Sequence, residues 1–107
     1  MSKAKILLLE DDANLNETIT EFLEDEGYEV TSTYDGYEAQ DSLYESKFDL
    51  LLLDVNTPGI DGFTLLREAR DNDVVAPSIF ITSLDGVEDL EKVSKVVVMT
   101  TYENLLS

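Results

Sequence analysis

Three short apolar runs constrain the fold of this chain more than any other feature of its sequence. They are Lys5–Leu9, residues 48–53 and residues 78–81, and they consist mostly of leucine, isoleucine and phenylalanine. A strand that is apolar on both faces is typical of a parallel sheet buried between helices, whereas a half-exposed strand alternates apolar and polar residues. The runs therefore predict three buried parallel strands.

The segments between these runs predict helices and one further strand. Leu15, Ile19, Phe22 and Leu23 fall on a single helical face, with Asp12 or Asn14 as the cap and Gly27 as the end. Residues 29–34 predict a short strand, and helices are expected after Asp35-Gly36 and over residues 63–70. Strands that alternate with helices imply right-handed crossovers and a sheet with helices on both faces.

Composition limits the classes of function. The chain has 107 residues, which suits one domain over residues 1–107, and 24 acidic against 7 basic residues give a net charge of -17. Such a charge argues against direct binding to nucleic acid or to an anionic membrane. The sequence contains no cysteine and no histidine, which excludes thiolate zinc sites and histidine-dependent triads. No long apolar span or signal peptide opens the chain, so we expect a cytoplasmic protein.

Acidic and hydroxyl side chains follow the predicted strands. Glu10-Asp11-Asp12 comes after the first run, Asp54 after the third strand and Thr82-Ser83 after the fourth. In open parallel sheets, ligands bind beyond the carboxyl ends of the strands, so these residues are expected to converge on one site. Asp12 is better explained as a helix cap than as a ligand.

The chemistry of that set points to magnesium and phosphate. Clustered carboxylates repel one another unless a cation compensates, and Mg²⁺ prefers one or two carboxylates together with phosphate oxygens and water. An aspartate carboxylate can also act as the nucleophile that forms an aspartyl phosphate. A threonine hydroxyl such as that of Thr82 can donate a hydrogen bond to a phosphoryl oxygen.

Three motifs make the chain resemble the receiver domains of response regulators in two-component signal transduction. They are KILLLEDD at residues 5–12, DLLLLDVNTPGIDGF at residues 49–63 and PSIFITS at residues 77–83. The resemblance is clear over residues 3–92, and residues 93–107 are atypical. It implies a flavodoxin-like, doubly wound, parallel five-stranded α/β sheet.

The resemblance also implies a role for each site residue. Asp54 would accept a phosphoryl group from a histidine kinase or a phosphotransfer protein, and the change would pass to an unknown downstream protein. Asp11, Asp54 and the backbone carbonyl of Asn56 would bind Mg²⁺ directly, with Glu10 acting through a coordinated water. Thr82 would contact the phosphoryl group, while Asn56 and Leu84 would tune its lifetime.

The last third of the chain departs from the family pattern. Receiver domains usually end a fifth strand with a lysine that pairs with the phosphoryl group, but here the only lysines after Thr82 are Lys92 and Lys95, both before the next apolar run. We favour residues 96–99 as the fifth strand, after a shortened fourth helix at residues 87–94 and before a short last helix at residues 102–107. Alternatively, this segment pairs elsewhere, including with a second chain in a dimer. A truncated, spliced or engineered chain would produce either arrangement.

Three functions remain open. The first is a phosphoacceptor signalling module, not an enzyme, in which the absent lysine predicts weaker coupling between phosphorylation and conformational change. The second is a receiver-like interaction or assembly module that phosphorylation does not switch. The third is a phosphatase with an aspartate nucleophile, which usually needs a second aspartate two residues later; Asn56 occupies that position and disfavours this class.

Overall fold

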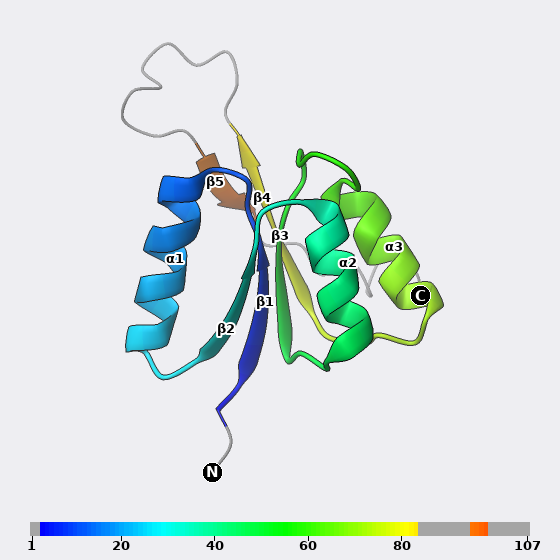
Figure 1. The fold of residues 1–107 in the computed structure, drawn as a ribbon, viewed down its shortest axis with the longest axis horizontal. Helices are drawn as coiled ribbons and strands as arrows, with labels where there is room; N and C mark the ends of the chain where they lie inside the picture. Colours follow the sequence, from blue (N-terminus) through cyan, green and yellow to red (C-terminus); the bar gives the residue numbers. More distant parts are fainter. Residues whose placement is uncertain (1–2, 84–94, 99–107) are drawn as a thin grey trace.

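The computed structural model describes residues 3–83 and 95–98, with side chains described over residues 3–81. Strands and helices alternate along this part of the chain, as the sequence predicts (Figure 1). In chain order they are β1 (Lys5–Leu9), α1 (Ala13–Asp25), β2 (Glu29–Thr33), α2 (Gly36–Glu45), β3 (Leu50–Asp54), α3 (Gly62–Asp71), β4 (Ser78–Ser83) and β5 (Lys95–Val98).

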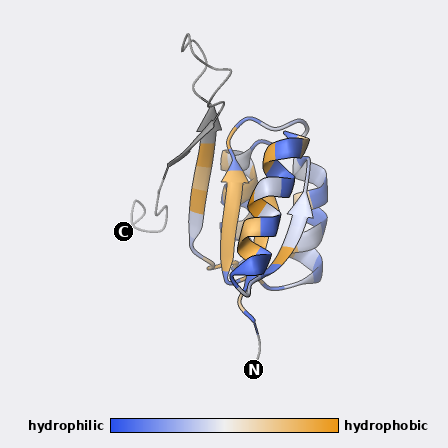
Figure 2. Ribbon diagram, turned by 90° about the vertical axis from the view of Figure 1, so that its left-hand side faces the viewer, coloured by the Kyte–Doolittle hydropathy of each residue, from blue (hydrophilic) through white to orange (hydrophobic). Residues whose placement is uncertain are grey.

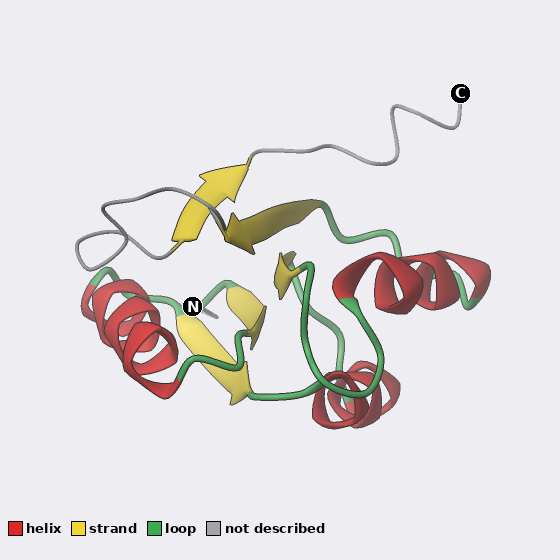
Figure 3. Cartoon of the chain, turned by 90° about the horizontal axis from the view of Figure 1, so that it is seen from above, coloured by secondary structure: helices red, strands yellow, loops and turns green. Residues whose placement is uncertain are grey.

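The strands form one five-stranded sheet in the order β2-β1-β3-β4-β5. The first four strands pair in parallel, so all four end at the same end of the sheet. Helix α1 covers one face, and α2 with α3 covers the other (Figures 1 and 3). This arrangement confirms the doubly wound, flavodoxin-like architecture.

The fifth strand corrects one part of the predicted sheet. β5 occupies the position beside β4 but runs antiparallel to it, with Phe80 opposite Val98 and Ser83 opposite Lys95. A parallel crossover usually needs a dozen or more residues, whereas antiparallel strands can be joined by a shorter segment. The connection between β4 and β5, residues 84–94, lies at the short end of the range for a parallel crossover, and its length is also compatible with an antiparallel strand. The helices predicted at residues 87–94 and 102–107 lie outside the described residues.

The apolar core lies between the sheet and the pair α2–α3. Most of the coloured strands are hydrophobic, whereas hydrophobic and hydrophilic residues alternate along the helices (Figure 2). Alternate residues of β1 and β3 point to this face and are completely buried. The buried cluster consists of Leu7, Leu9, Ala39, Leu51, Leu53, Leu65, Leu66, Ala76 and Phe80. Ile6, Leu8 and Ile81, which point to the other face, are buried as well, and burial on both faces explains why these runs show no polar alternation.

Each helix begins at an aspartate cap at the carboxyl end of the sheet. The side chain of Asp12 accepts a hydrogen bond from the backbone of Leu15, which decides between Asp12 and Asn14 as the first cap. Asp35 and Asp61 cap α2 and α3 in the same way. Within the described residues, no helix has the length and apolar character needed to cross a membrane.

Candidate functional site

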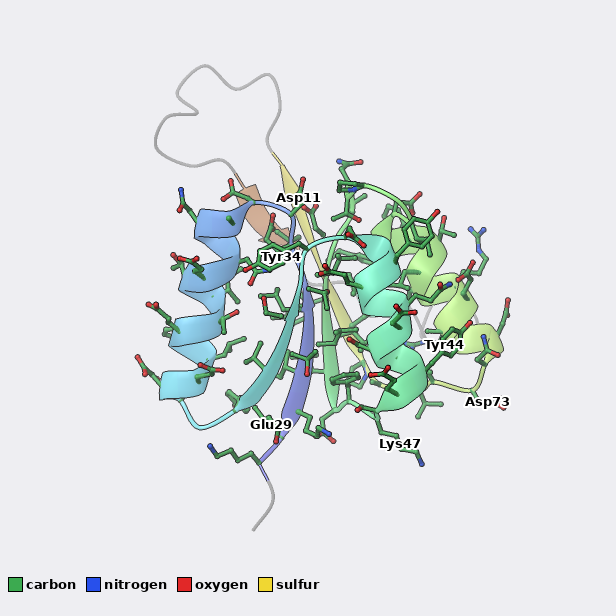
Figure 4. The ribbon with its side chains drawn as sticks, viewed as in Figure 1. Asp11, Glu29, Tyr34, Tyr44, Lys47 and Asp73 are labelled. Atoms are coloured by element: carbon green, nitrogen blue, oxygen red, sulfur yellow. The ribbon has the colours of Figure 1, made fainter. Side chains whose placement is uncertain are left out.

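Three carboxylates meet at the carboxyl end of the sheet. Glu10 and Asp11 follow β1, Asp54 ends β3, and one carboxylate oxygen from each lies within 4.8 Å of the others. We call these three residues the acidic cluster. Glu10 and Asp54 are completely buried, whereas Asp11 is exposed. Figure 4 shows Asp11 at this end of the molecule and Lys47 at the opposite end. The sequence correctly predicted that these strand ends converge.

Asp54 contacts β4, the loop that follows β3 and the start of α3. It pairs with Ile81 of β4, and its Oδ1 accepts a hydrogen bond of 3.1 Å from the backbone N–H of Asn56. The helix α3 approaches so closely that a Cβ on Gly62 would lie 2.5 Å from the carbonyl oxygen of Asp54. Only glycine fits there, so the Asp-Gly motif fixes the distance between α3 and the end of β3.

The loop that carries Glu10 and Asp11 is fixed by hydrogen bonds. Glu10 Oε2 accepts a hydrogen bond of 2.9 Å from the backbone N–H of Asp12. The backbone N–H of Glu10 donates a hydrogen bond of 3.1 Å to the carbonyl of Thr33. The Glu10 carboxylate therefore links the end of β1 to the start of α1. This link orients the loop toward Asp54.

Asn16 is a buried residue beside the acidic cluster that the sequence analysis did not single out. It is the only buried side chain of α1, and its Nδ2 donates 3.0 Å hydrogen bonds to the carbonyls of both Glu10 and Thr33. Its Oδ1 accepts from the hydroxyl of Ser32. Asn16 thereby joins the carboxyl ends of β1 and β2. One feature of the sequence could have indicated Asn16. It is an asparagine, a weak helix former, and it directly follows Leu15 on the inner face of the helix.

Two other predicted site residues, Asn56 and Thr82, are located by their backbones. Asn56 is exposed in the loop after β3, and its backbone contacts Asp54 as described above. Thr82 lies in β4 with its backbone opposite Val96, which places it at the carboxyl end of the sheet. Its side chain and Leu84 lie outside the described residues, so their roles remain predictions.

The acidic cluster has the donor set that a hard divalent cation prefers. Three carboxylates within 4.8 Å repel one another when ionised, and a cation bound between them would offset that repulsion. All the ligands are oxygens, and no histidine or cysteine exists in the chain. Such a set suits Mg²⁺ better than zinc or another transition metal. The residues present therefore fit magnesium.

The family model for the response regulator receiver domain matches residues 6–103, which is most of the chain. The chain belongs to this family. Receiver domains are signalling modules of two-component systems, and they interact with histidine kinases or phosphotransfer proteins.

Curated relatives support the assignment over most of the chain. The transcriptional regulatory protein CrdR of Helicobacter pylori is 44% identical over 81 residues, covering 75% of this chain and 38% of that protein. The regulatory protein VanRB of Enterococcus faecalis is 41% identical over 86 residues, covering 79% of this chain and 38% of that protein. This receiver domain therefore spans less than half the length of these relatives.

Solved structures share the fold. The receiver domain of Francisella response regulator 1452 superposes with a TM-score of 0.73 at 28% identity, covering 84% of this chain and 74% of that one. The response regulator TrrA of Thermotoga maritima, solved with Mg²⁺ and BeF, superposes with a TM-score of 0.66 at 33% identity. The match covers 70% of this chain and 65% of that one. The second structure is a receiver-fold relative bound to the metal that the acidic cluster fits.

Proposed function

We propose that this receiver domain accepts a phosphoryl group on Asp54 from a phosphohistidine of a histidine kinase or phosphotransfer protein, with Mg²⁺ bound at the acidic cluster. The observation that carries the proposal is the convergence of Glu10, Asp11 and Asp54 within 4.8 Å at the carboxyl end of the sheet. The absence of histidine from the chain fits a donor histidine supplied by another protein. A downstream protein of unknown identity would read the phosphorylated state.

Asp54 would be the nucleophile. Its carboxylate oxygen forms a bond to phosphorus while the bond from phosphorus to the donor imidazole nitrogen breaks, and the electron pair stays on that nitrogen. The product is an aspartyl phosphate and a dephosphorylated donor. The hydrogen bond from the backbone of Asn56 to Asp54 Oδ1 holds the carboxylate in one orientation. Holding the nucleophile in this way lowers the entropic barrier to transfer.

The remaining site residues would bind the metal and the phosphoryl group. Glu10, Asp11, Asp54 and the backbone carbonyl of Asn56 would hold Mg²⁺, which neutralises charge that develops on the transferring phosphoryl group. Thr82 follows Ile81, the residue of β4 that pairs with Asp54, which supports a role for Thr82 at this site. Its hydroxyl would donate a hydrogen bond to a phosphoryl oxygen.

A second function is supported by one observation. β5 runs antiparallel to β4, unlike the parallel fifth strand that the family resemblance predicts, so the surface around this strand differs from that expected. A receiver-like interaction or assembly module that phosphorylation does not switch would tolerate such a change. A dimer through this strand would be one form of it.

Incubation with Mg²⁺ and acetyl phosphate, followed by intact mass measurement, separates the two functions. We expect a mass increase of one phosphoryl group in the parent chain and none in Asp54→Asn, which keeps the shape but removes the nucleophile. Asp71→Asn is the matched control, because Asp71 is exposed at the far end of α3. No adduct on the parent chain at any Mg²⁺ concentration would favour the assembly module.

A further inference from the structure

The start of α2 packs directly against the loop that contains Asn56. This loop, residues 55–61, joins β3 to α3. The backbone N–H of Gly36, the first residue of α2, donates a hydrogen bond of 3.1 Å to the carbonyl of Pro58. A Cβ on Gly36 would lie 2.0 Å from the carbonyl oxygen of Ile60, so only glycine allows this approach. The first residue of α2 and the loop are therefore in contact through their backbones.

Tyr37 contacts the tip of the same loop. Gly59 has a φ of 80°, and a Cβ built on it would lie 2.7 Å from two ring carbons of Tyr37. The ring therefore covers the position that a side chain at residue 59 would occupy. Tyr37 is 61% exposed, so its ring contributes little to the apolar core. We call Gly36 and Tyr37 the α2 clamp, because both restrain the loop from the same side.

Hydrogen bonds within the loop connect these contacts to Asn56. The hydroxyl of Thr57 donates a hydrogen bond of 3.1 Å to the carbonyl of Ile60, which closes the turn over residues 57–60. Asn56 directly precedes this turn, and its backbone N–H donates to Asp54 Oδ1. A displacement of the turn would therefore move the peptide group of Asn56, whose carbonyl is the metal ligand in the proposed function.

We propose that the α2 clamp fixes the Asn56 carbonyl and thereby makes the site selective for Mg²⁺ over Ca²⁺. This inference rests on the proposed function. Mg²⁺ requires near-ideal octahedral geometry at about 2.0–2.1 Å, whereas Ca²⁺ accepts roughly six to eight oxygens at about 2.3–2.6 Å in flexible arrangements. A carbonyl that is fixed in one place therefore favours the smaller ion. Gly36 and Tyr37 act through the loop, so they are positioning residues.

Dissociation constants for Mg²⁺ and for Ca²⁺, each measured by NMR titration of the metal-free chain, test this role. In Tyr37→Ala we expect Mg²⁺ to bind roughly 3- to 10-fold more weakly, because binding of the metal must then also order the loop. Ca²⁺ accommodates a displaced ligand, so its binding should weaken by less than about 2-fold. The free energy of unfolding, measured in urea, should stay close to that of the parent chain because the ring is largely exposed.

Two variants serve as matched controls. Tyr37→Phe keeps the ring over Gly59 and should retain the parent affinity for both ions. Tyr44 lies in the last turn of the same helix, away from Asp11, and is 68% exposed (Figure 4). Tyr44→Ala should therefore leave both affinities unchanged.

Gly59→Ala tests the same contact from the side of the loop. The added methyl group would meet the ring of Tyr37, so the loop has to shift and the preference for Mg²⁺ should fall. In a chain that already carries Tyr37→Ala, the ring is absent and the further fall should be smaller. This non-additive response is expected for two residues in direct contact.

A merely structural role for Tyr37 would weaken the binding of both ions in the same proportion. That result in Tyr37→Ala overturns the inference, and so does unchanged binding of both ions. A loss in Tyr37→Phe as large as that in Tyr37→Ala, or a parent chain that binds Ca²⁺ as tightly as Mg²⁺, also overturns it. A parent chain that binds no Mg²⁺ and takes no phosphoryl group from acetyl phosphate overturns the proposed function itself.

Discussion

The helices on the two faces of the sheet bury different kinds of side chain. On the face covered by α2 and α3, side chains such as Leu51, Leu53 and Leu66 are completely buried in one apolar cluster. On the face covered by α1, the apolar residues of the helix are only half buried or exposed, and the buried residue of α1 is the polar Asn16.

From this difference we infer that one face mainly stabilises the fold and the other mainly positions the acidic cluster. Apolar burial stabilises in proportion to the area removed from water, so the α2–α3 face should contribute most of the free energy of folding. A buried amide contributes little net stability, but it makes directional hydrogen bonds that hold specific groups. Asn16 holds the carbonyl of Glu10, so the α1 face is the one that orients the acidic cluster.

The largest expected effect comes from the apolar face. Leu53→Ala removes a completely buried side chain next to Asp54 and should lower the free energy of unfolding by about 3–5 kcal/mol through lost burial and a residual cavity. Leu52→Ala is the matched control on the neighbouring position of β3. Leu52 is half buried on the α1 face, so its loss should be roughly 1–2 kcal/mol. Urea unfolding measures both values. Equal losses would show that the two faces contribute alike.

The next largest effect should come from Asn16. Asn16→Ala leaves the carbonyls of Glu10 and Thr33 without this donor and should lower the free energy of unfolding by roughly 1–3 kcal/mol. It should also weaken Mg²⁺ binding several-fold, because the loop that carries Glu10 and Asp11 loses its anchor. Both quantities are measured on the same sample, by urea unfolding and by Mg²⁺ titration.

Asn14→Ala provides the control for this second prediction. Asn14 is exposed on the same helix, so its replacement should leave stability and Mg²⁺ affinity close to those of the parent chain. Leu53→Ala should lower stability without a comparable loss of Mg²⁺ affinity while the chain is folded. If Asn16→Ala lowered stability but left Mg²⁺ binding intact, Asn16 would support the fold and not the site.

The parallel part of the sheet and the acidic cluster could be predicted because local patterns determine them. A strand buried on both faces has to be apolar throughout, and parallel strands bring the residues that follow them to one end of the sheet. Glu10, Asp11 and Asp54 therefore follow from the positions of the runs. The match to the family model spans all three positions.

The direction of β5 and the role of Asn16 could not be predicted, because both depend on contacts between distant segments. Val96, Val97 and Val98 are suited to a strand in either direction, and the length of the preceding connection does not decide between the two directions. Asn16 lies in α1 and contacts Thr33 at the end of β2, and a single asparagine gives no periodic signal. The assignment of residues 1–107 to a single domain remains a prediction.

Phe22 is less buried than its helical spacing predicts. Its replacement should therefore have the smallest effect on the free energy of unfolding. The spacing places Phe22 on the same stripe as Leu23, but its side chain is 63% exposed, whereas Leu23 is half buried. Phe22→Ala should change the free energy of unfolding by less than about 0.5 kcal/mol, because the little burial lost is offset by the higher helix propensity of alanine.

Leu23→Ala should lower the free energy of unfolding by roughly 1 kcal/mol in the same urea assay, because leucine and alanine have similar helix propensities and no gain offsets the lost burial. A loss above about 1 kcal/mol in Phe22→Ala would mean that its ring is covered in solution. Helix α1 would then bury an apolar side chain of its own. The difference between the α1 face and the α2–α3 face would hold only in the region around Asn16.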